Sequence, residues 1–270
     1  MDGYFHALAA LACSDNQTMA TMQLQDILFS QGFGTRRVCS GLIQQGLVAV
    51  DQVICAQPAT DFIADGLCFT VQGVDWQYHE KAYLMLHKPA GHECSQKPST
   101  YPSIYTLLPA PIRQRGGSAA AGVQAVGRLD QDTTGLLLLS DDGKFIHRMS
   151  SPKHHVPKVY EVTAKHAVDD QQVQKLLSGV VLDDDPKPVK AAACVQTGPN
   201  QLSLTLTEGK YHQVKRMIAA VGNRVEGDGG KISGGGGLHR SRIGSLVLPD
   251  DLKPGQWRWL TAADLALIAS

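Results

Sequence analysis

Net charge is the first property that this sequence lacks. Lysine and arginine together number 25, and aspartate and glutamate also number 25, so positive and negative charges balance. A protein that binds nucleic acid through bulk charge carries a basic excess, and this composition counts against that class. Any RNA site in the chain must therefore depend on local clusters of cations.

Paired cysteines and long apolar runs are also missing. The six cysteines are scattered and none belongs to a Cys-x-x-Cys pair, which indicates reduced, mostly buried thiols. No window approaches the roughly 18 apolar residues of a membrane span. The apolar run over residues 5–13 follows Asp2 and has no preceding lysine or arginine, so we do not expect it to be a signal peptide. We expect a soluble, cytoplasmic protein that does not attach to membranes.

The chain is long enough for two folding units. Its 270 residues, 43% of them hydrophobic, can bury one large core and one small core. The pattern predicts a flexible N-terminal extension over 1–21, a small domain over 22–74 and a polar linker over 75–81 that joins the domains flexibly. The large domain then covers 82–270 and begins with the apolar run 82–87.

Two helices and a hairpin are expected in the small domain. Apolar residues at helical spacing over 24–28 predict the first helix, and Thr35 is a suitable N-cap for the second. Alternation over 47–55, with a turn at Asp51-Gln52, predicts a hairpin, and a last strand is expected over 67–71.

Two arginines of the small domain occupy an unusual place. Arg36 and Arg37 lie in the first turn of the second helix, where the helix dipole disfavours cations, and this indicates an anionic partner. The helix–helix–hairpin pattern resembles the small RNA-binding domain first seen in ribosomal protein S-four. In that domain the counterparts of Arg36 and Arg37 contact backbone phosphates, so the resemblance implies that this domain binds RNA.

The most informative stretch of the large domain is a polar loop that leads into an apolar strand. Residues 127–135 have the sequence Gly-Arg-Leu-Asp-Gln-Asp-Thr-Thr-Gly, and the apolar run 136–139 follows them. A carboxylate such as Asp130, two residues from Arg128 at the mouth of a buried strand, can acquire an altered pKa or nucleophilicity. The same residues could also form a surface loop whose side chains bond local backbone.

A basic segment follows the central motif. Residues 147–158 concentrate cationic and imidazole groups, including Lys153, His154 and Lys158. They form either a solvated basic loop or a surface that follows phosphates. A metal site at His154-His155 is not expected, because adjacent side chains diverge and no third ligand is evident.

A late helix carries two more cations. The pattern over 213–221 predicts a helix with Lys215 and Arg216 in its body beside apolar residues. A lysine near the core needs a carboxylate partner, although both cations could instead extend their charges into solvent.

Three blocks of the large domain resemble the signature of the pseudouridine synthases that modify ribosomal RNA. They are 127–137, 158–162, and 208–217 with its continuation 238–244. Together with the small domain they cover nearly the whole chain after residue 21. Residues 151–155 and 211–217 are most similar to the branch that acts on a uridine of small-subunit (16S) ribosomal RNA. Relatives that act on large-subunit (23S) RNA tend to have an Asn-Arg pair where Tyr211-His212 stand here.

The resemblance implies an α+β fold and an isomerase. The large domain would hold a mixed, mainly antiparallel sheet, and its central cleft would convert uridine to pseudouridine in ribosomal RNA. It implies that Asp130 is the nucleophile, that Lys215 pairs with Asp130, and that Tyr160 stacks on the turned base. Such a reaction involves no redox change, so we expect no cofactor and no metal.

The expected partner is ribosomal RNA, taken as a small-subunit assembly intermediate by a monomeric enzyme. The residues that we expect to bind RNA are Arg36, Arg37, Arg128, Lys153, His154, Lys158, His212, Arg216 and Arg240. Two alternatives stay open: the same chemistry on 23S RNA, and a catalytically silent RNA-binding factor in ribosome assembly. Between Val225 and Leu238 relatives usually have only a couple of residues, whereas this chain has residues 226–237. This segment lacks the spacing of a phosphate-binding loop, so we expect a flexible insertion there.

Overall fold

The apolar run 136–139 lies in strand β9 (Thr134–Ser140), at the middle of the large sheet. A strand turns successive side chains to opposite faces. Leu137 and Leu139 enter one buried cluster, whereas Leu136 and Leu138 enter another on the opposite face. Because both faces of β9 are covered, the strand needs no polar side chain in this run, and the predicted buried strand is confirmed.

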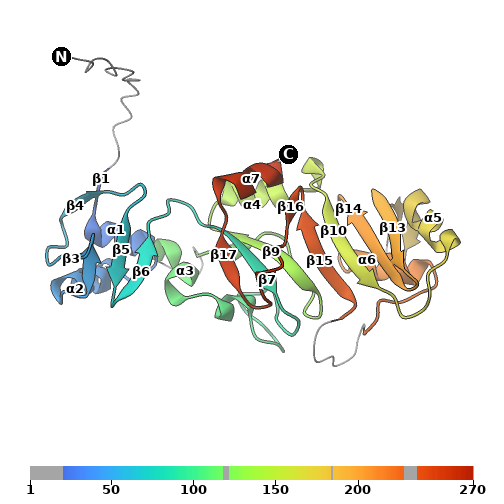
Figure 1. Ribbon diagram of the computed structural model, residues 1–270, viewed down its shortest axis with the longest axis horizontal. Coiled ribbons are helices and arrows are strands. Elements are labelled where there is room, and N and C mark those ends of the chain that lie inside the picture. The colour runs from blue at the N-terminus through green and yellow to red at the C-terminus, as the bar shows by residue number, and fades with distance from the viewer. Residues whose placement is uncertain (1–20, 118–121, 184, 228–235, 270) are drawn as a thin grey trace, which may run out of the picture.

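The computed structural model describes residues 21–117, 122–183, 185–227 and 236–269. In these residues a small N-terminal unit lies at one end of an elongated large unit (Figure 1). The expected extension over 1–21 lies outside the described residues except for Thr21. The expected insertion over 226–237 also lies mostly outside them.

The large unit is built on a nine-stranded sheet with the order β13-β14-β10-β15-β9-β7-β17, in which β16 pairs with β15 and β8 pairs with β9. Besides β9, its strands are β7 (Tyr83–Lys88), β8 (Gln124–Ala125), β10 (Lys158–Thr163), β13 (Ala193–Gly198), β14 (Gln201–Leu206), β15 (Leu238–Ile243), β16 (Leu246–Val247) and β17 (Trp257–Trp259). Among the strands that the structure describes in this sheet, only β9 and β15 run parallel. The predicted mixed, mainly antiparallel sheet is therefore confirmed.

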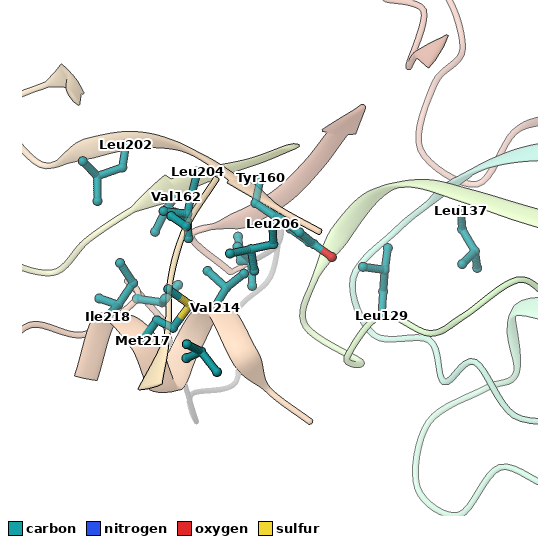
Figure 2. Close-up of a cluster of buried hydrophobic side chains, with 14 of the residues drawn as sticks. Leu129, Leu137, Tyr160, Val162, Leu202, Leu204, Leu206, Val214, Met217 and Ile218 are labelled. Carbon is teal, nitrogen blue, oxygen red and sulfur yellow. The ribbon is translucent and has the colours of Figure 1, made fainter. Parts of the chain in front are cut away.

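Helices cover both faces of this sheet. They are α3 (Ala110–Arg113), α4 (Gly143–Ser150), α5 (Asp170–Ser178), α6 (Gln213–Ala220) and α7 (Ala262–Ala269), with the short turns η1 (Ile104–Leu107), η2 (Arg115–Gly117) and η3 (Pro152–His154) and the hairpin β11 (Val180–Leu182)–β12 (Asp185–Val189). Helices α4 and α7 contribute to the cluster of Leu136 and Leu138, and α5 and α6 contribute to the other. Figure 2 shows α6 placing Met217 and Ile218 beneath the leucines of β14.

Strand β15 brings together the two segments that carry the predicted catalytic residues. It lies between β9 and β10, with Arg240 opposite Gly135 of β9 on one side and opposite Tyr160 of β10 on the other. Opposed residues project to the same face of a sheet. The loop before β9, which holds Asp130, thus meets Tyr160 across a single strand.

The small unit agrees with the predicted helix–helix–hairpin order. It consists of β1 (Thr21–Gln23), α1 (Leu24–Ser30), α2 (Arg36–Gln44), β2 (Val48–Val50), β3 (Val53–Ile54), β4 (Asp61–Ile63), β5 (Cys68–Val71) and β6 (Val74–Gln77). The Thr35 side chain accepts a hydrogen bond from the backbone of Val38 at 3.3 Å, which confirms the predicted cap of α2. Four strands form a sheet in the order β3-β2-β5-β6.

The expected linker over 75–81 is wrong for its first three residues. Strand β6 pairs with β5 from Val74 to Gln77, so these residues belong to the small sheet. Asp75 and Gln77 are exposed polar residues on either side of Trp76, which packs on the core, as expected of an edge strand with one solvated face.

The expected flexible joint between the units is replaced by a buried contact. Arg115 is only 3% exposed. Its guanidinium donates to Asp141 of the large unit at 2.7 Å and to the side chain of Gln31, which follows α1, at 2.6 Å. The rings of His79 and Trp259 also stack at 3.7 Å. Because a buried guanidinium must keep its partners, these contacts dock the small unit against the large sheet.

Among the helices that the structure describes, none has both the length and the apolar character that crossing a bilayer requires.

Candidate active site

A buried lysine donates hydrogen bonds to the backbone of the loop before β9. Lys88, the last residue of β7, has no exposed surface, and its Nζ donates to the backbone carbonyls of Pro89 (3.0 Å), Gln131 (3.2 Å) and Thr133 (2.9 Å). Burial lowers its pKa to about 8. Two of the three carbonyls flank Asp132, so Lys88 defines the backbone path of the loop. The sequence analysis missed this residue, whose only signal is a lysine directly after the apolar run 82–87.

Asp130 lies at the edge of a pocket that the predicted catalytic residues share. The pocket is lined by Arg128, Leu129, Asp130, Thr133, Tyr160, Leu206, Glu208, Gly209, Lys210, His212, Gln213, Val214, Lys215 and Leu238. Residues from the loop, from β10 and from α6 thus converge, although they are distant in the sequence. The side chain of Asp130 keeps 28% of its surface exposed, which leaves the carboxylate open to a ligand.

A histidine and a lysine approach the carboxylate of Asp130. His212 Nε2 lies 3.3 Å from Oδ1, and Lys215 Nζ lies 3.8 Å from Oδ2. Burial raises the pKa of Asp130, the neighbouring His212 and Lys215 oppose that rise, and the charge of Asp132 adds to it. The site therefore holds a partly desolvated carboxylate whose ionised form depends on these neighbours.

The closest partner of Lys215 is Asp132. Its Nζ lies 2.9 Å from Oδ1 and 2.7 Å from Oδ2 of Asp132, and the two side chains are 10% and 13% exposed. The sequence analysis expected Lys215 to pair with Asp130, whereas the structure divides the lysine between two carboxylates and gives the shorter contacts to Asp132. Asp132 was missed because the sequence does not show which carboxylate of the loop faces α6.

Tyr160 closes the pocket from the sheet side. It is 9% exposed, and its ring projects from β10 with the hydroxyl directed toward Leu129 of the loop before β9 (Figure 2). Arg240 lies behind it, with the guanidinium carbon 6.0 Å from the centre of the ring. Arg240 is 2% exposed and its Nε donates to the carbonyl of Leu136 at 2.7 Å. Arg240 thus lies inside the protein, although the sequence analysis predicted it to bind RNA.

His212 adopts a backbone conformation that few residues tolerate. It immediately precedes α6 with φ 48° and ψ 32°, the left-handed region, and makes no side-chain cap. A non-glycine residue there costs roughly 1 kcal/mol or more, and such strain is often found at functional sites. The strain turns the imidazole toward Asp130. The sequence analysis placed His212 only among the RNA contacts and missed its contact with the predicted nucleophile.

The other predicted RNA contacts are distributed over both units. Arg128 is exposed at the pocket, and Lys153 and His154 are exposed on η3. Lys158 is half-buried at the start of β10, donates to the carbonyl of Val156 at 3.0 Å, and has its pKa lowered to about 8, chiefly by burial.

The cations of the small unit lie apart from the pocket residues, on the first turn of α2. Arg36 bonds Asp26 at 2.9 Å and lies over the ring of Phe29, while Arg37 is exposed. Arg216 of α6 donates to the carbonyl of Tyr211 at 3.1 Å. The structure therefore brings Asp130, Lys215 and their neighbours together, and it leaves the small-unit arginines on a separate surface.

Comparison with known proteins identifies relatives of this chain. Residues 82–220 match the family described as RNA pseudouridylate synthase. A ribosomal small subunit pseudouridine synthase A from Pasteurella multocida (strain Pm70) is 37% identical over 246 residues, which cover 91% of this chain and 98% of the relative. The protein of that name from Escherichia coli (strain K12) is 41% identical over 192 residues, 71% of this chain and 76% of the relative. A crystal structure of a pseudouridylate synthase aligns with a TM-score of 0.61 and 33% identity over 92% of this chain and 99% of that chain.

Proposed function

The chain belongs to the RNA pseudouridylate synthase family, and we propose that it isomerises a uridine of small-subunit (16S) ribosomal RNA to pseudouridine. The observation that carries the proposal is the convergence of Asp130, Lys215 and Tyr160 on one pocket, in a chain that matches nearly the full length of a relative named for the small subunit. These residues come from three blocks far apart in the sequence. A protein that only bound RNA would have no need of a partly desolvated carboxylate in such a pocket.

The reaction exchanges one bond of the nucleotide for another. The bond from ribose C1′ to base nitrogen N1 breaks, the base turns, and C1′ bonds to C5, whose proton leaves while N1 gains one. Atoms and electrons balance without an oxidant, so the protein must supply a nucleophile and proton transfer. Asp130 is the nucleophile, and its contact with Lys215 and His212 keeps the carboxylate ionised and oriented.

Tyr160 holds the base while it turns. Its ring forms a wall of the pocket and its hydroxyl points toward the catalytic loop, so it can stack on the uracil and relay a proton (Figure 2). The target uridine must leave its helix to reach this pocket. Arg128 at the pocket and Lys153 and His154 on η3 are exposed basic side chains that hold the flanking phosphates.

The small unit is an RNA-binding domain of the ribosomal-protein-S-four type. It covers residues 22–77, and residues 78–81 connect it to the large unit. Arg36 and Arg37 on the first turn of α2 contact phosphates at some distance from the target. We propose that the enzyme acts as a monomer. Because the chain carries no net positive charge, we propose that its substrate is a small-subunit assembly intermediate, in which bound ribosomal proteins add to the docking surface.

A mapping experiment tests this function. Wild type and Asp130→Asn are incubated with 16S RNA, 23S RNA and a partly assembled small subunit, and pseudouridine is located by carbodiimide-blocked primer extension. We expect a stop in small-subunit RNA with wild type and none with Asp130→Asn. A stop only in 23S RNA would show that the substrate is large-subunit RNA. Tight binding by both proteins without any stop would identify a silent assembly factor.

A further inference from the structure

The rim of the pocket carries an exposed pair of stacked rings. Tyr211 and His212 lie with their ring centres 3.8 Å apart and their planes within 19° of parallel. His212 contacts Asp130 and lines the pocket, whereas Tyr211 is 70% exposed. The pair therefore runs outward from the carboxylate, first His212 and then Tyr211, and the outer face of the tyrosine is open to solvent.

The backbone that carries this pair is held by contacts on both sides of it. The side chain of Gln213, 5% exposed, accepts a hydrogen bond from the backbone of Lys210 at 2.8 Å and closes the turn before α6. The carbonyl of Tyr211 accepts from Arg216 at 3.1 Å. His212 is held in the left-handed conformation. An aromatic ring that stacks on its neighbour and stands on a backbone held in this way loses less conformational entropy when a ligand stacks on it than a ring on a free loop would.

Extrusion of the target uridine leaves a neighbouring base that can stack on the exposed face of Tyr211. A uridine that leaves its helix to reach Asp130 deprives its neighbour of a stacking partner. Proteins that hold single-stranded RNA replace such lost contacts with aromatic side chains, because every base presents a π-face. The face of Tyr211 lies one stacked ring beyond His212, the group that touches the carboxylate of Asp130, so it is within reach of a base next to a uridine bound at Asp130.

We propose that Tyr211, backed by His212, is a stacking platform for the nucleobase adjacent to the target uridine. This inference rests on the proposed function, and it assigns a binding and specificity role to a residue that takes no part in bond breaking. Stacking strength increases with the size of the base, so the platform favours a purine at that position.

Fluorescence of a modified base tests the platform directly. A synthetic RNA spans the uridine mapped by primer extension and carries 2-aminopurine on its 5′ side in one version and its 3′ side in another. Binding is measured in an Asp130→Asn background, so that no turnover occurs. We expect quenching in one of the two versions, loss of that quenching in Tyr211→Ala, and binding weaker by roughly 5- to 160-fold, the range of base–aromatic stacking. Tyr211→Phe and Tyr211→Trp should retain both the quenching and the binding affinity, since a stack needs the ring and not the hydroxyl.

Turnover and salt dependence separate stacking from charge and from misfolding. With Asp130 intact, Tyr211→Ala should raise KM and leave kcat close to wild type. The increase in KM caused by Tyr211→Ala should be the same at low and high salt. The increase in KM caused by Arg128→Ala should instead diminish as the salt concentration rises. Val247→Ala, which shortens another exposed apolar side chain, is the control for a general surface effect.

If the wild type forms pseudouridine but Tyr211→Ala binds and reacts normally, the platform is refuted and the proposed function survives. Weaker binding by Tyr211→Ala with no quenching in either wild-type version would also overturn stacking. A wild type that forms no pseudouridine on any RNA removes the proposed function itself.

Discussion

Replacement of Lys215 by methionine tests how the site keeps its nucleophile ionised. Methionine nearly preserves the length and volume of the side chain and removes only the charge. Lys215 lies between two carboxylates, at 3.8 Å from Asp130 and 2.7 Å from Asp132, and it is 10% exposed. Without it, two partly buried carboxylates face each other across the loop, and protonation of one of them becomes the favourable way to relieve their repulsion.

The size of the effect follows from the distance to Asp130. Two unit charges at this separation interact by about 4 kcal/mol with an effective dielectric constant of about 20, and by about 1 kcal/mol in water. Asp130 is 28% exposed, so the value lies between these limits, at about 2 to 3 kcal/mol. Expressed as a rate, the loss in kcat/KM is roughly 30- to 160-fold near neutral pH. Lys215→Arg keeps the charge and should lose much less.

The assay is the initial rate of pseudouridine formation on the mapped RNA at several pH values. Because the missing cation acts through the ionisation of Asp130, whose pKa burial already raises, the loss of kcat/KM in Lys215→Met should diminish as pH rises. Lys175→Met, an exposed lysine of α5, is the matched control, and the melting temperature of each variant shows that it is folded. A folded Lys215→Met enzyme with wild-type kcat/KM, measured beside an inactive Asp130→Asn, would refute the reasoning.

Three other outcomes follow from the structure. Burial raises the pKa of Asp130, so the folded state binds its proton more tightly than the unfolded chain and this carboxylate costs stability as pH rises through the raised value. Asp130→Asn should therefore melt a few degrees above wild type near neutral pH and gain less near about pH 4, by differential scanning calorimetry. At Gly135 (φ 109°) an added Cβ would lie 2.3 Å from a backbone carbonyl oxygen of β15. Gly135→Ala should therefore lower the free energy of unfolding in urea by more than about 3 kcal/mol. Gly143→Ala, where the added Cβ meets open space, should stay near wild type. A bidentate bond from Arg258 holds the pKa of Asp264 at about 2, so the pair stabilises the fold above the ordinary aspartate range and loses that contribution as pH falls toward 2. Asp264→Asn should cost about 1 kcal/mol near neutral pH, after allowance for the partial exposure of the arginine, and almost nothing near about pH 2; equal losses at both values would contradict this account.

Local pattern was enough to predict much of the fold. The apolar run 136–139 with its polar, glycine-bracketed entrance identified β9, and Thr35 identified the start of α2. These features depend on residues within a few positions of one another, since side-chain alternation and helix capping are short-range effects. Resemblance then related Asp130, Tyr160 and Lys215 to one chemistry, and the structure brings all three to one pocket.

The partners within the site could not be read from the sequence. Lys215 reaches Asp132 across 83 positions, and Lys88 reaches the carbonyl of Thr133 across 45, because the order of strands and not their spacing in the chain brings them together. The same holds for Arg115, whose buried bonds dock the small unit that composition predicted to be loosely joined.

By itself the sequence determined several of the strands and helices, β9 and α2 among them, and the residue types that the chemistry requires, since these follow from local periodicity and from motifs. The tertiary structure alone decided which carboxylate holds the lysine, that Arg240 lies inside the sheet, and that His212 faces the nucleophile. Strand β15 lies between β9 and β10 and so defines these neighbours, and such long-range pairing is a property of the whole fold.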